Sequence, residues 1–249
     1  MNDLQEVRTL SRRLHGLLIS LTKKLPPGTS YSELYRKAEE ILLREDPGTV
    51  LSTLDLNINS TVCHCSSPGR SLTEGDIITL DIVITKNGLY ADGAWSTICG
   101  KGNERSHRLI EQAWETARAA VLSVTPGSSS LETKKAVHNS LAGSGFSLLT
   151  EACGHGIGTK MHMPPDINFS ITNKDDVLFK EGMIFTIEPV ISRCGAKLIY
   201  SKEKEWRTDN LEASAYFEHM VAINENKSEC LNLPEIIQQK SIDIFQQII

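Results

Sequence analysis

The sequence has no apolar run close to the ~20 residues that a membrane-spanning helix needs, so it predicts no transmembrane segment. Residues 1–25 also lack the uninterrupted apolar segment of a secretory signal peptide. Their apolar side chains recur at helical spacing instead and predict an amphipathic helix over 3–24. The arginines of this stretch leave a transit peptide as the alternative to a helix that docks on the protein.

Basic residues are not in excess, and the cysteines follow no pattern. Lys and Arg number 26 against 31 Asp and Glu, a formal net charge of −5, which argues against stable binding of nucleic acid. The six cysteines are irregularly spaced, so reduced thiols and a cytoplasmic location are expected. A hydrophobic content of 40% is that of an ordinary packed core.

The chain contains an internal repeat. EGDIITLDIVIT at 74–85 matches EGMIFTIEPVIS at 181–192, and Asp81 falls opposite Glu188. Both segments have the composition of a buried strand. A carboxylate is costly to bury unless a cation or strong hydrogen-bond donors compensate it. The repeat therefore predicts that both acids meet the same compensating partner.

A second pair of matching segments lies upstream. PPGTSYSEL at 26–34 and TPGSSSLET at 125–133 each predict a Pro-Gly turn and then a capping box, Ser30/Glu33 and Ser129/Glu132. A helical pattern precedes each segment, the later one over 104–124. We therefore expect one α+β domain over 1–249, with mainly antiparallel sheet flanked by helices. It would comprise two α/β halves, about 1–100 and 101–225, related by a pseudo-two-fold axis, and a tail helix at 233–249.

The first half brings two acids together. The Asn-Gly pair at 87–88 predicts a two-residue hairpin turn. Pairing the flanking residues places Asp81 opposite Ala94 and makes Asp92 its diagonal neighbour on the same face. Diagonal positions are ~7–8 Å apart, close enough for two carboxylates to hold one ion. A solvent-facing polar pair is the alternative, but the apolar neighbours at 82–84 indicate burial.

The second half supplies more polar groups. ASAYFEHMVAI at 213–223 is interpreted as a returning strand with Glu218 in an apolar run. CGHGIGTKMHMPP at 153–165 carries His155 between glycines, which allow close backbone approach, and His162 follows. A lone histidine in such a loop is more often structural, but here four embedded carboxylates need a cation. Four carboxylates and an imidazole suit two divalent ions of Mn, Fe, Co or Zn. Two such ions lower the pKa of a shared water, which is hydrolytic chemistry.

Cys63-His64-Cys65 offers a competing zinc site. A structural zinc takes four ligands, and the sequence has no partner pair with CxxC-type spacing. We therefore favour a role for His64 without zinc.

These motifs together resemble the type I methionine aminopeptidases, which have the pita-bread fold of duplicated α/β halves. The resemblance covers residues 1 to about 231. The motifs that carry it are VCH (62–64), GDIITLDI (75–82), ADGAWST (91–97), GHGIG (154–158), MHMPP (161–165), GMIFTIEP (182–189) and YFEH (216–219).

The resemblance implies two divalent metal ions (Co, Mn, Fe or Zn) and a metallo-exopeptidase that removes N-terminal methionine. The implied metal ligands are Asp81, Asp92, His155, Glu188 and Glu218. His64 and His162 would lie beside the scissile bond and donate hydrogen bonds to the tetrahedral intermediate, while Glu188 shuttles the proton.

The departures from the family lie mostly in the substrate pocket. Met161 replaces the aromatic that usually precedes the second histidine, and Asp55 replaces a small residue. The aromatic-rich loop upstream is shortened at 45–54. Cys63 and Trp206 match pocket positions of the family. Met161 as a flexible packing substitute and Asp55 facing water are the structural alternatives to a changed first-residue preference.

Three hypotheses follow. The first is a methionine aminopeptidase that acts on nascent or short polypeptide N-termini, as a monomer with transient ribosome contact and no membrane partner. The second is an aminopeptidase of the same fold with another first-residue preference. The third is a non-catalytic binding protein, which is disfavoured because such proteins usually lose metal ligands and all five are present.

Overall fold

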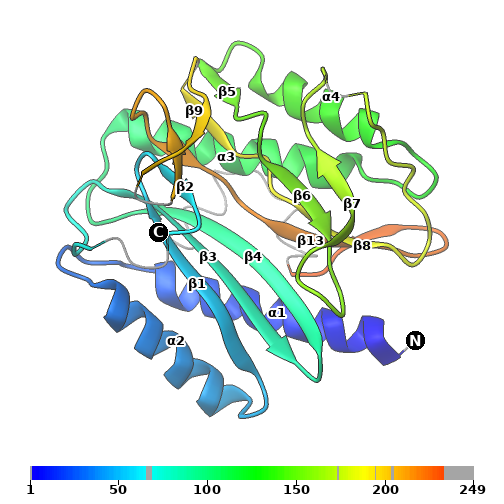
Figure 1. Ribbon diagram of the computed structural model, residues 1–249, viewed down its shortest axis with the longest axis horizontal. Coiled ribbons are helices and arrows are strands. Elements are labelled where there is room, and N and C mark those ends of the chain that lie inside the picture. The colour runs from blue at the N-terminus through cyan, green and yellow to red at the C-terminus, as the bar shows by residue number, and fades with distance from the viewer. Residues whose placement is uncertain (1, 66–68, 173, 194, 203–204, 233–249) are drawn as a thin grey trace.

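The computed structural model describes residues 2–65, 69–172, 174–193, 195–202 and 205–232. In this part of the chain the helices come in two pairs, one in each half of the sequence (Figure 1). They are α1 (Asn2–Thr22), α2 (Tyr31–Glu45), α3 (Glu104–Ser123) and α4 (Ser130–Leu141). The helices predicted over 3–24 and 104–124 are thus confirmed as α1 and α3. The predicted tail helix at 233–249 lies outside the described residues.

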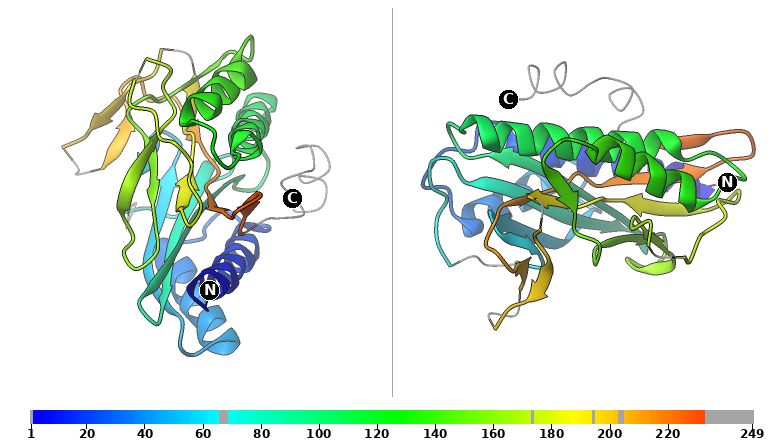
Figure 2. Two further views of the ribbon diagram at one scale, coloured as in Figure 1. Left: turned by 90° about the vertical axis from the view of Figure 1, so that its right-hand side faces the viewer. Right: turned by 90° about the horizontal axis from the view of Figure 1, so that it is seen from above.

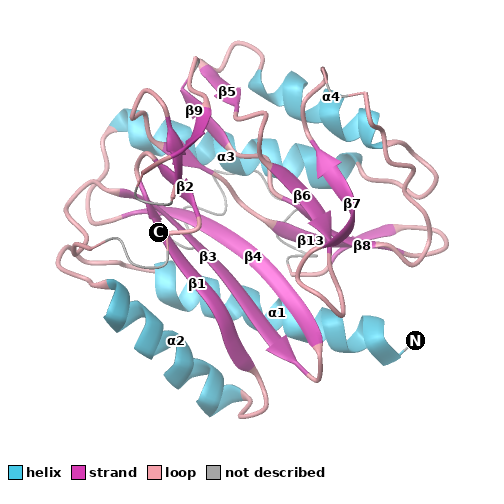
Figure 3. Cartoon of the chain, in the orientation of Figure 1, coloured by secondary structure: helices cyan, strands magenta, loops and turns pink. Residues whose placement is uncertain are grey.

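The described strands form antiparallel sheets (Figure 3). The largest contains β14 (Ser228–Cys230), β13 (His219–Ile223), β8 (Ile184–Ile187), β6 (Cys153–Gly156) and β7 (Met163–Asn168), in that order. A second contains β1 (Val50–Ile58), β3 (Ile77–Lys86) and β4 (Leu89–Ile98). Two small sheets contain β10 (Leu198–Tyr200), β11 (Trp206–Thr208) and β2 (Thr61–Cys63), and β12 (Ser214–Ala215), β9 (Ile191–Arg193) and β5 (Phe146–Leu148).

The two predicted capping boxes differ in the structure. The Ser30 side chain accepts from the Glu33 N–H and the Glu33 carboxylate accepts from the Ser30 N–H, so the first box is confirmed. Ser129 caps α4, but its Oγ accepts from the Leu131 N–H at 3.2 Å. The second box is wrong because the Glu132 carboxylate reaches forward to Lys135 instead.

The helices lie together on one side of the sheets, and the β10–β11 hairpin projects on the other side (Figure 2). Helix α1 packs on β4 through a stripe of buried leucines, which include Leu14 and Leu18. Gly93 permits this approach, since a Cβ there would lie 3.3 Å from Leu14 Cδ2. Within the described residues no helix is long and apolar enough to cross a membrane.

Three aromatic rings join the two halves in the core. Trp95 of β4, Trp114 of α3 and Phe217, just before β13, have ring centroids 4.9 to 5.6 Å apart. Phe217 meets both tryptophans edge-on, the geometry that aromatic quadrupoles favour. The first-half sheet is therefore packed directly against elements of the second half.

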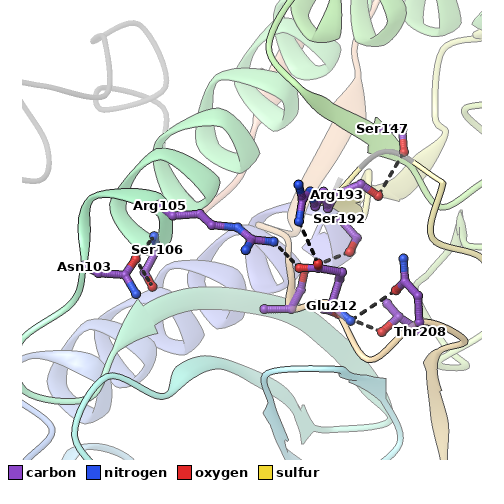
Figure 4. A network of polar contacts seen from close by, with 10 residues as sticks. Asn103, Arg105, Ser106, Ser147, Ser192, Arg193, Thr208 and Glu212 are labelled. Carbon is purple, nitrogen blue, oxygen red and sulfur yellow. Dashed lines mark hydrogen bonds and ion pairs between the residues drawn. The ribbon is translucent and has the colours of Figure 1, made fainter.

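A polar network at one end of α3 holds the loops of the second half in place (Figure 4). The Glu212 carboxylate accepts from Arg105 of α3 and from Arg193 of β9, the latter at 3.0 Å. Thr208 Oγ1 donates to the Glu212 carbonyl at 2.7 Å. The network fixes β9 and the start of β12, and these strands flank the segments that carry Glu188 and Glu218.

Candidate active site

A cavity of about 760 Å³ lies where the two halves meet. Strands of the β1-β3-β4 sheet supply one part of its lining, and strands and loops of the second half supply the rest. Every site residue that the sequence indicated lines it. These residues are Asp55, Cys63, His64, Asp81, Asp92, His155, Met161, His162, Glu188, Trp206 and Glu218.

The first-half acids lie on a continuous hairpin. Asp81 pairs with Ala94 across the β3–β4 ladder, so the predicted register is confirmed. Asp92 lies on the same face, is buried, and has no hydrogen-bond partner for Oδ1 among the described residues. Asp81 accepts a hydrogen bond of 2.7 Å from the hydroxyl of Tyr216. The hairpin thus places two carboxylates at the cavity, a buried one on Asp92 and a partly buried one on Asp81.

The second-half acids lie where strands end. β8 stops at Ile187, directly before Glu188, and β13 starts directly after Glu218. The prediction of unbroken strands through Glu188 and Glu218 was wrong, in part because Pro189 has no N–H to donate to a strand ladder. His219 pairs with Ile187, so the two breaks coincide and bring the two carboxylates together. The Glu218 N–H donates to the Ala94 carbonyl at 3.0 Å, which ties this edge to the first-half hairpin.

His155 is held so that one ring nitrogen faces the acids. Its Nδ1 lies 3.1 Å from the Gly156 carbonyl, which can only accept, so Nδ1 carries the proton. Nε2 then faces the cavity, 3.7 Å from Asp92 Oδ2 and 3.8 Å from Glu188 Oε1. Burial lowers the pKa of His155, which keeps the imidazole neutral and free to bind a metal.

Glycines beside His155 allow the close approach of neighbouring backbone. A Cβ on Gly154 would lie 2.2 Å from the Thr186 carbonyl oxygen, and one on Gly156 would lie 2.3 Å from that of Pro164. No side chain fits at such distances. The glycines of the GHGIG motif therefore let β6 lie between β7 and β8, which places His155 against the carboxylates.

Burial raises the pKa of all four acids, and neighbouring carboxylates raise it further. Burial raises the pKa of Glu188 to about 8 and that of Asp81 to about 6. The pKa values of Asp92 and Glu218 are raised well above their ordinary values, first by burial and then by the neighbouring carboxylates. Four clustered acids, two of them buried and two partly buried, are an unfavourable arrangement without a compensating cation.

The site has the composition of a divalent-metal centre. One ligand atom each from Asp92, His155 and Glu218 lie within 4.8 Å of one another, and this is the one such grouping among the described residues. Oxygen ligands with one imidazole suit Mn, Fe, Co or Zn. Two divalent ions would balance the charges of all four carboxylates.

The alternative zinc site at Cys63-His64-Cys65 gains no support from the described residues. Neither cysteine belongs to the ligand grouping. Burial raises the pKa of the Cys63 thiol, which disfavours the thiolate that zinc binds. Cys65 is buried, and its N–H donates to Asn57 Oδ1. His64 instead faces Asp55, whose Oδ2 lies 3.7 Å from its Nδ1.

The remaining predicted residues form the walls of the cavity. The His162 ring contacts that of His155 at a centroid distance of 4.2 Å, with the two ring planes tilted by 55°. Trp206 of β11 pairs with Cys63 of β2, and its ring contacts that of Tyr200 in a tilted arrangement at a centroid distance of 5.1 Å. Met161 lines the same cavity beside His162.

Sequence reasoning missed two residues that support the acids. Thr186 Oγ1 donates to Glu188 Oε1 at 2.7 Å and accepts from the His155 N–H at 3.0 Å. Tyr216 donates to Asp81. Thr186 recurs in the internal repeat as Thr79, and this match could have drawn attention to it.

Residues 5–225 match the profile of metallopeptidase family M24. The chain belongs to this family. Methionine aminopeptidase of Escherichia coli (strain K12) is 29% identical over 242 residues, which cover 93% of this chain and 91% of that protein. Methionine aminopeptidase of Buchnera aphidicola subsp. Acyrthosiphon pisum (strain APS) is 32% identical over 197 residues, covering 78% and 72% respectively.

A solved structure confirms the predicted fold. Methionine aminopeptidase from Rickettsia prowazekii superposes with a TM-score of 0.86 at 23% identity, covering 93% of this chain and 97% of that one. This M24 chain therefore has the pita-bread fold, with duplicated α/β halves about a pseudo-two-fold axis. As a metallopeptidase, it is a hydrolase that uses a divalent metal ion.

Proposed function

We propose that this M24 chain is a methionyl aminopeptidase that removes the N-terminal methionine from polypeptides, favouring a small second residue. The observation that carries the proposal is the cluster of four carboxylates, two buried and two partly buried, around a neutral imidazole in one cavity. The curated relatives named methionine aminopeptidase match nearly the whole chain.

The proposed ligands of two divalent ions (Co, Mn, Fe or Zn) are Asp81, Asp92, His155, Glu188 and Glu218. When bound, the ions act as Lewis acids and lower the pKa of water at the site. The buried, unpartnered oxygens of Asp92 and Glu218 fit this role, because a cation would satisfy them.

The other residues of the cavity move protons and bind the substrate. Glu188 takes the proton from the attacking water and delivers it to the leaving amine, with Thr186 holding its Oε1 in place. His162 and His64 donate hydrogen bonds to the oxygen on which negative charge develops. Cys63, Met161 and the Trp206 ring provide apolar contacts for the first side chain.

We further propose that residues 1–249 act as one catalytic domain, working as a monomer in the cytoplasm on nascent or short polypeptides. Ribosome contact would be transient, because the net charge of −5 gives no broad basic surface for RNA.

A panel of X-Ala-Ser tripeptides, with protein stripped of metal and reloaded with Mn, Fe, Co or Zn, tests the proposal. Metal-dependent release of methionine above all other residues is expected. Bound metal without release of any residue would contradict catalysis and would favour a binding protein.

A second candidate is an aminopeptidase with another first-residue preference. The observation that favours it is Asp55, a buried carboxylate that lines the cavity outside the proposed ligand set. The same tripeptide panel separates the two candidates, since release of a residue other than methionine would favour the second.

A further inference from the structure

Asp55 is the acid of the cavity that the proposed metal centre does not use. It lies on β1 directly opposite Asp81 of β3, so both side chains lie on the same face of the sheet. Its side chain is only 8% exposed. Among the described residues, the His64 imidazole is the one charged group at ion-pair distance from its carboxylate.

The backbone holds His64 in this position. The Cys65 carbonyl accepts from the Leu56 N–H at 2.8 Å, and the Cys65 N–H donates to Asn57 Oδ1 at 3.3 Å. These bonds clamp the end of the 61–65 segment against β1, next to Asp55. His64 itself has a φ of +62°, a conformation that costs energy for a residue other than glycine. The fold therefore keeps this histidine in a strained backbone position beside the acid.

The contact decides which ring nitrogen of His64 is available. The carboxylate faces Nδ1 at 3.7 Å, within ion-pair distance and beyond a close hydrogen bond. A carboxylate at Nδ1 favours a proton on that nitrogen and orients the ring. Nε2 then faces the cavity that His64 lines. The imidazole is otherwise 60% exposed, and the neighbouring Cys63 side chain is its second polar contact.

We propose that Asp55 is a positioning residue, whose carboxylate holds Nδ1–H of His64 and fixes the Nε2–H donor toward the first peptide bond of the substrate. The inference rests on the proposed aminopeptidase function. It gives Asp55 a role through His64 and leaves the choice of the first residue to other groups in the pocket.

A double-mutant cycle tests this role. The four proteins are the full chain and its Asp55→Asn, His64→Asn and doubly substituted variants, all loaded with the same metal. Asp55→Asn should lower kcat for Met-Ala-Ser about tenfold or more, with a smaller change in KM. In the His64→Asn background the same substitution should cost almost nothing further. Equal losses in both backgrounds would overturn the proposal.

Glu151→Gln is the matched control. Glu151 lines the same cavity, and its recorded hydrogen-bond partner is Thr150. Removing its charge should have the same effect with and without His64. If Asp55→Asn does not fold, Asp55→Thr provides a smaller polar substitute that suits a strand.

The ¹⁵N shifts of the histidine rings give a readout that needs no activity. In metal-free and zinc-loaded protein, the His64 signal, assigned by its loss in His64→Asn, should show protons on both Nδ1 and Nε2 at neutral pH, because the Asp55 carboxylate raises the pKa of His64 above its ordinary value. Asp55→Asn should lower the pKa of His64, so that the signal changes to that of the neutral ring at a lower pH, and an unchanged signal would overturn the proposal. If the wild type releases no residue, the shifts still test the Asp55–His64 pair. Asp55→Asn could also change the order of preferred first residues equally with and without His64. That result would instead make Asp55 a selectivity residue.

Discussion

The two halves of the molecule present their acids in different ways. In the first half, Asp81 and Asp92 lie inside a hairpin of two ten-residue strands with an unbroken register. In the second half, Glu188 and Glu218 lie just outside the paired ends of two short strands. The first pair is positioned by ladder hydrogen bonds, whereas the second depends on side-chain contacts, glycines and loops.

The first half therefore holds its acids on a rigid hairpin, whereas the second half holds its acids through close packing. The β3–β4 hairpin fixes the relative positions of Asp81 and Asp92 by its own register, without help from the rest of the sheet. The second-half acids keep their place through Thr186 and the narrow approach at Gly154. Substitutions that disturb these supports should therefore affect the stability of the two halves unequally. Loss of a proposed metal ligand should lower activity to the same degree in either half.

The largest expected effect comes from substituting, one at a time, the two acids that match each other in the internal repeat. Asp81→Asn and Glu188→Gln should each lower peptide hydrolysis by about 10³-fold or more, because both remove a proposed ligand from one functional unit. Steady-state kinetics, with bound metal measured by mass spectrometry and folding checked by thermal unfolding, would test this. Unchanged turnover at full metal content would reject the ligand assignment for that half.

A glycine substitution should reveal how tightly the second half is packed. Gly154→Ala places a Cβ 2.2 Å from the Thr186 carbonyl oxygen and should cost about 1–3 kcal/mol of unfolding free energy. Gly93→Ala in the first-half hairpin meets a flexible leucine side chain at 3.3 Å and should cost less. Gly158→Ala, whose Cβ would contact Met163 Sδ at 3.8 Å, is the control. Equal urea midpoints for all three would contradict the contrast.

In metal-free protein, Asp81 and Glu188 should each make the stability depend on pH, but over different pH ranges. Burial raises both folded pKa values, to about 6 and about 8, above the ordinary 3.8 and 4.5. Between these limits the folded chain binds more protons than the unfolded chain, so each acid makes the protein less stable as pH rises. Relative to wild type, Asp81→Asn should gain stability up to about pH 6 and Glu188→Gln up to about pH 8. Urea unfolding between pH 4 and 9 checks this, and a constant difference from wild type would contradict it.

The smallest effect concerns the repeated threonines. Thr79 Oγ1 shares a hydrogen bond of 2.8 Å with Ser96, whereas Thr186 Oγ1 donates to Glu188. Thr79→Val and Thr186→Val should each cost about 1 kcal/mol of stability. Only the second should also weaken metal binding, which isothermal titration would measure. Equal metal affinities would show that Thr186 does not support Glu188.

Much of the first half could be predicted from the sequence. The Asn-Gly turn fixes the hairpin register, and the register alone places Asp81 and Asp92 on one face. The repeat then carried the prediction to Glu188. The repeat could not show that its second copy is split between two sheets, because β8 pairs with β13 and β9 pairs with β12, and these partners come from later in the chain.

The supporting contacts were harder to predict for the same reason. Tyr216 reaches Asp81 across 135 positions of the sequence, and no local pattern encodes that distance. The direction of the Asp55 carboxylate toward His64 likewise follows from the clamp at Cys65, which only the folded chain shows.

The crowding of acids in the cavity also bears on the lifetime of the protein in a cell. At neutral pH a chain without metal keeps part of this repulsion, so the segments around Glu188 and Glu218 should open more often than in the loaded chain. Proteases cleave such transiently opened segments at rates that follow the open population. Metal shortage should therefore lower the amount of this protein through faster degradation, even where its synthesis is unchanged.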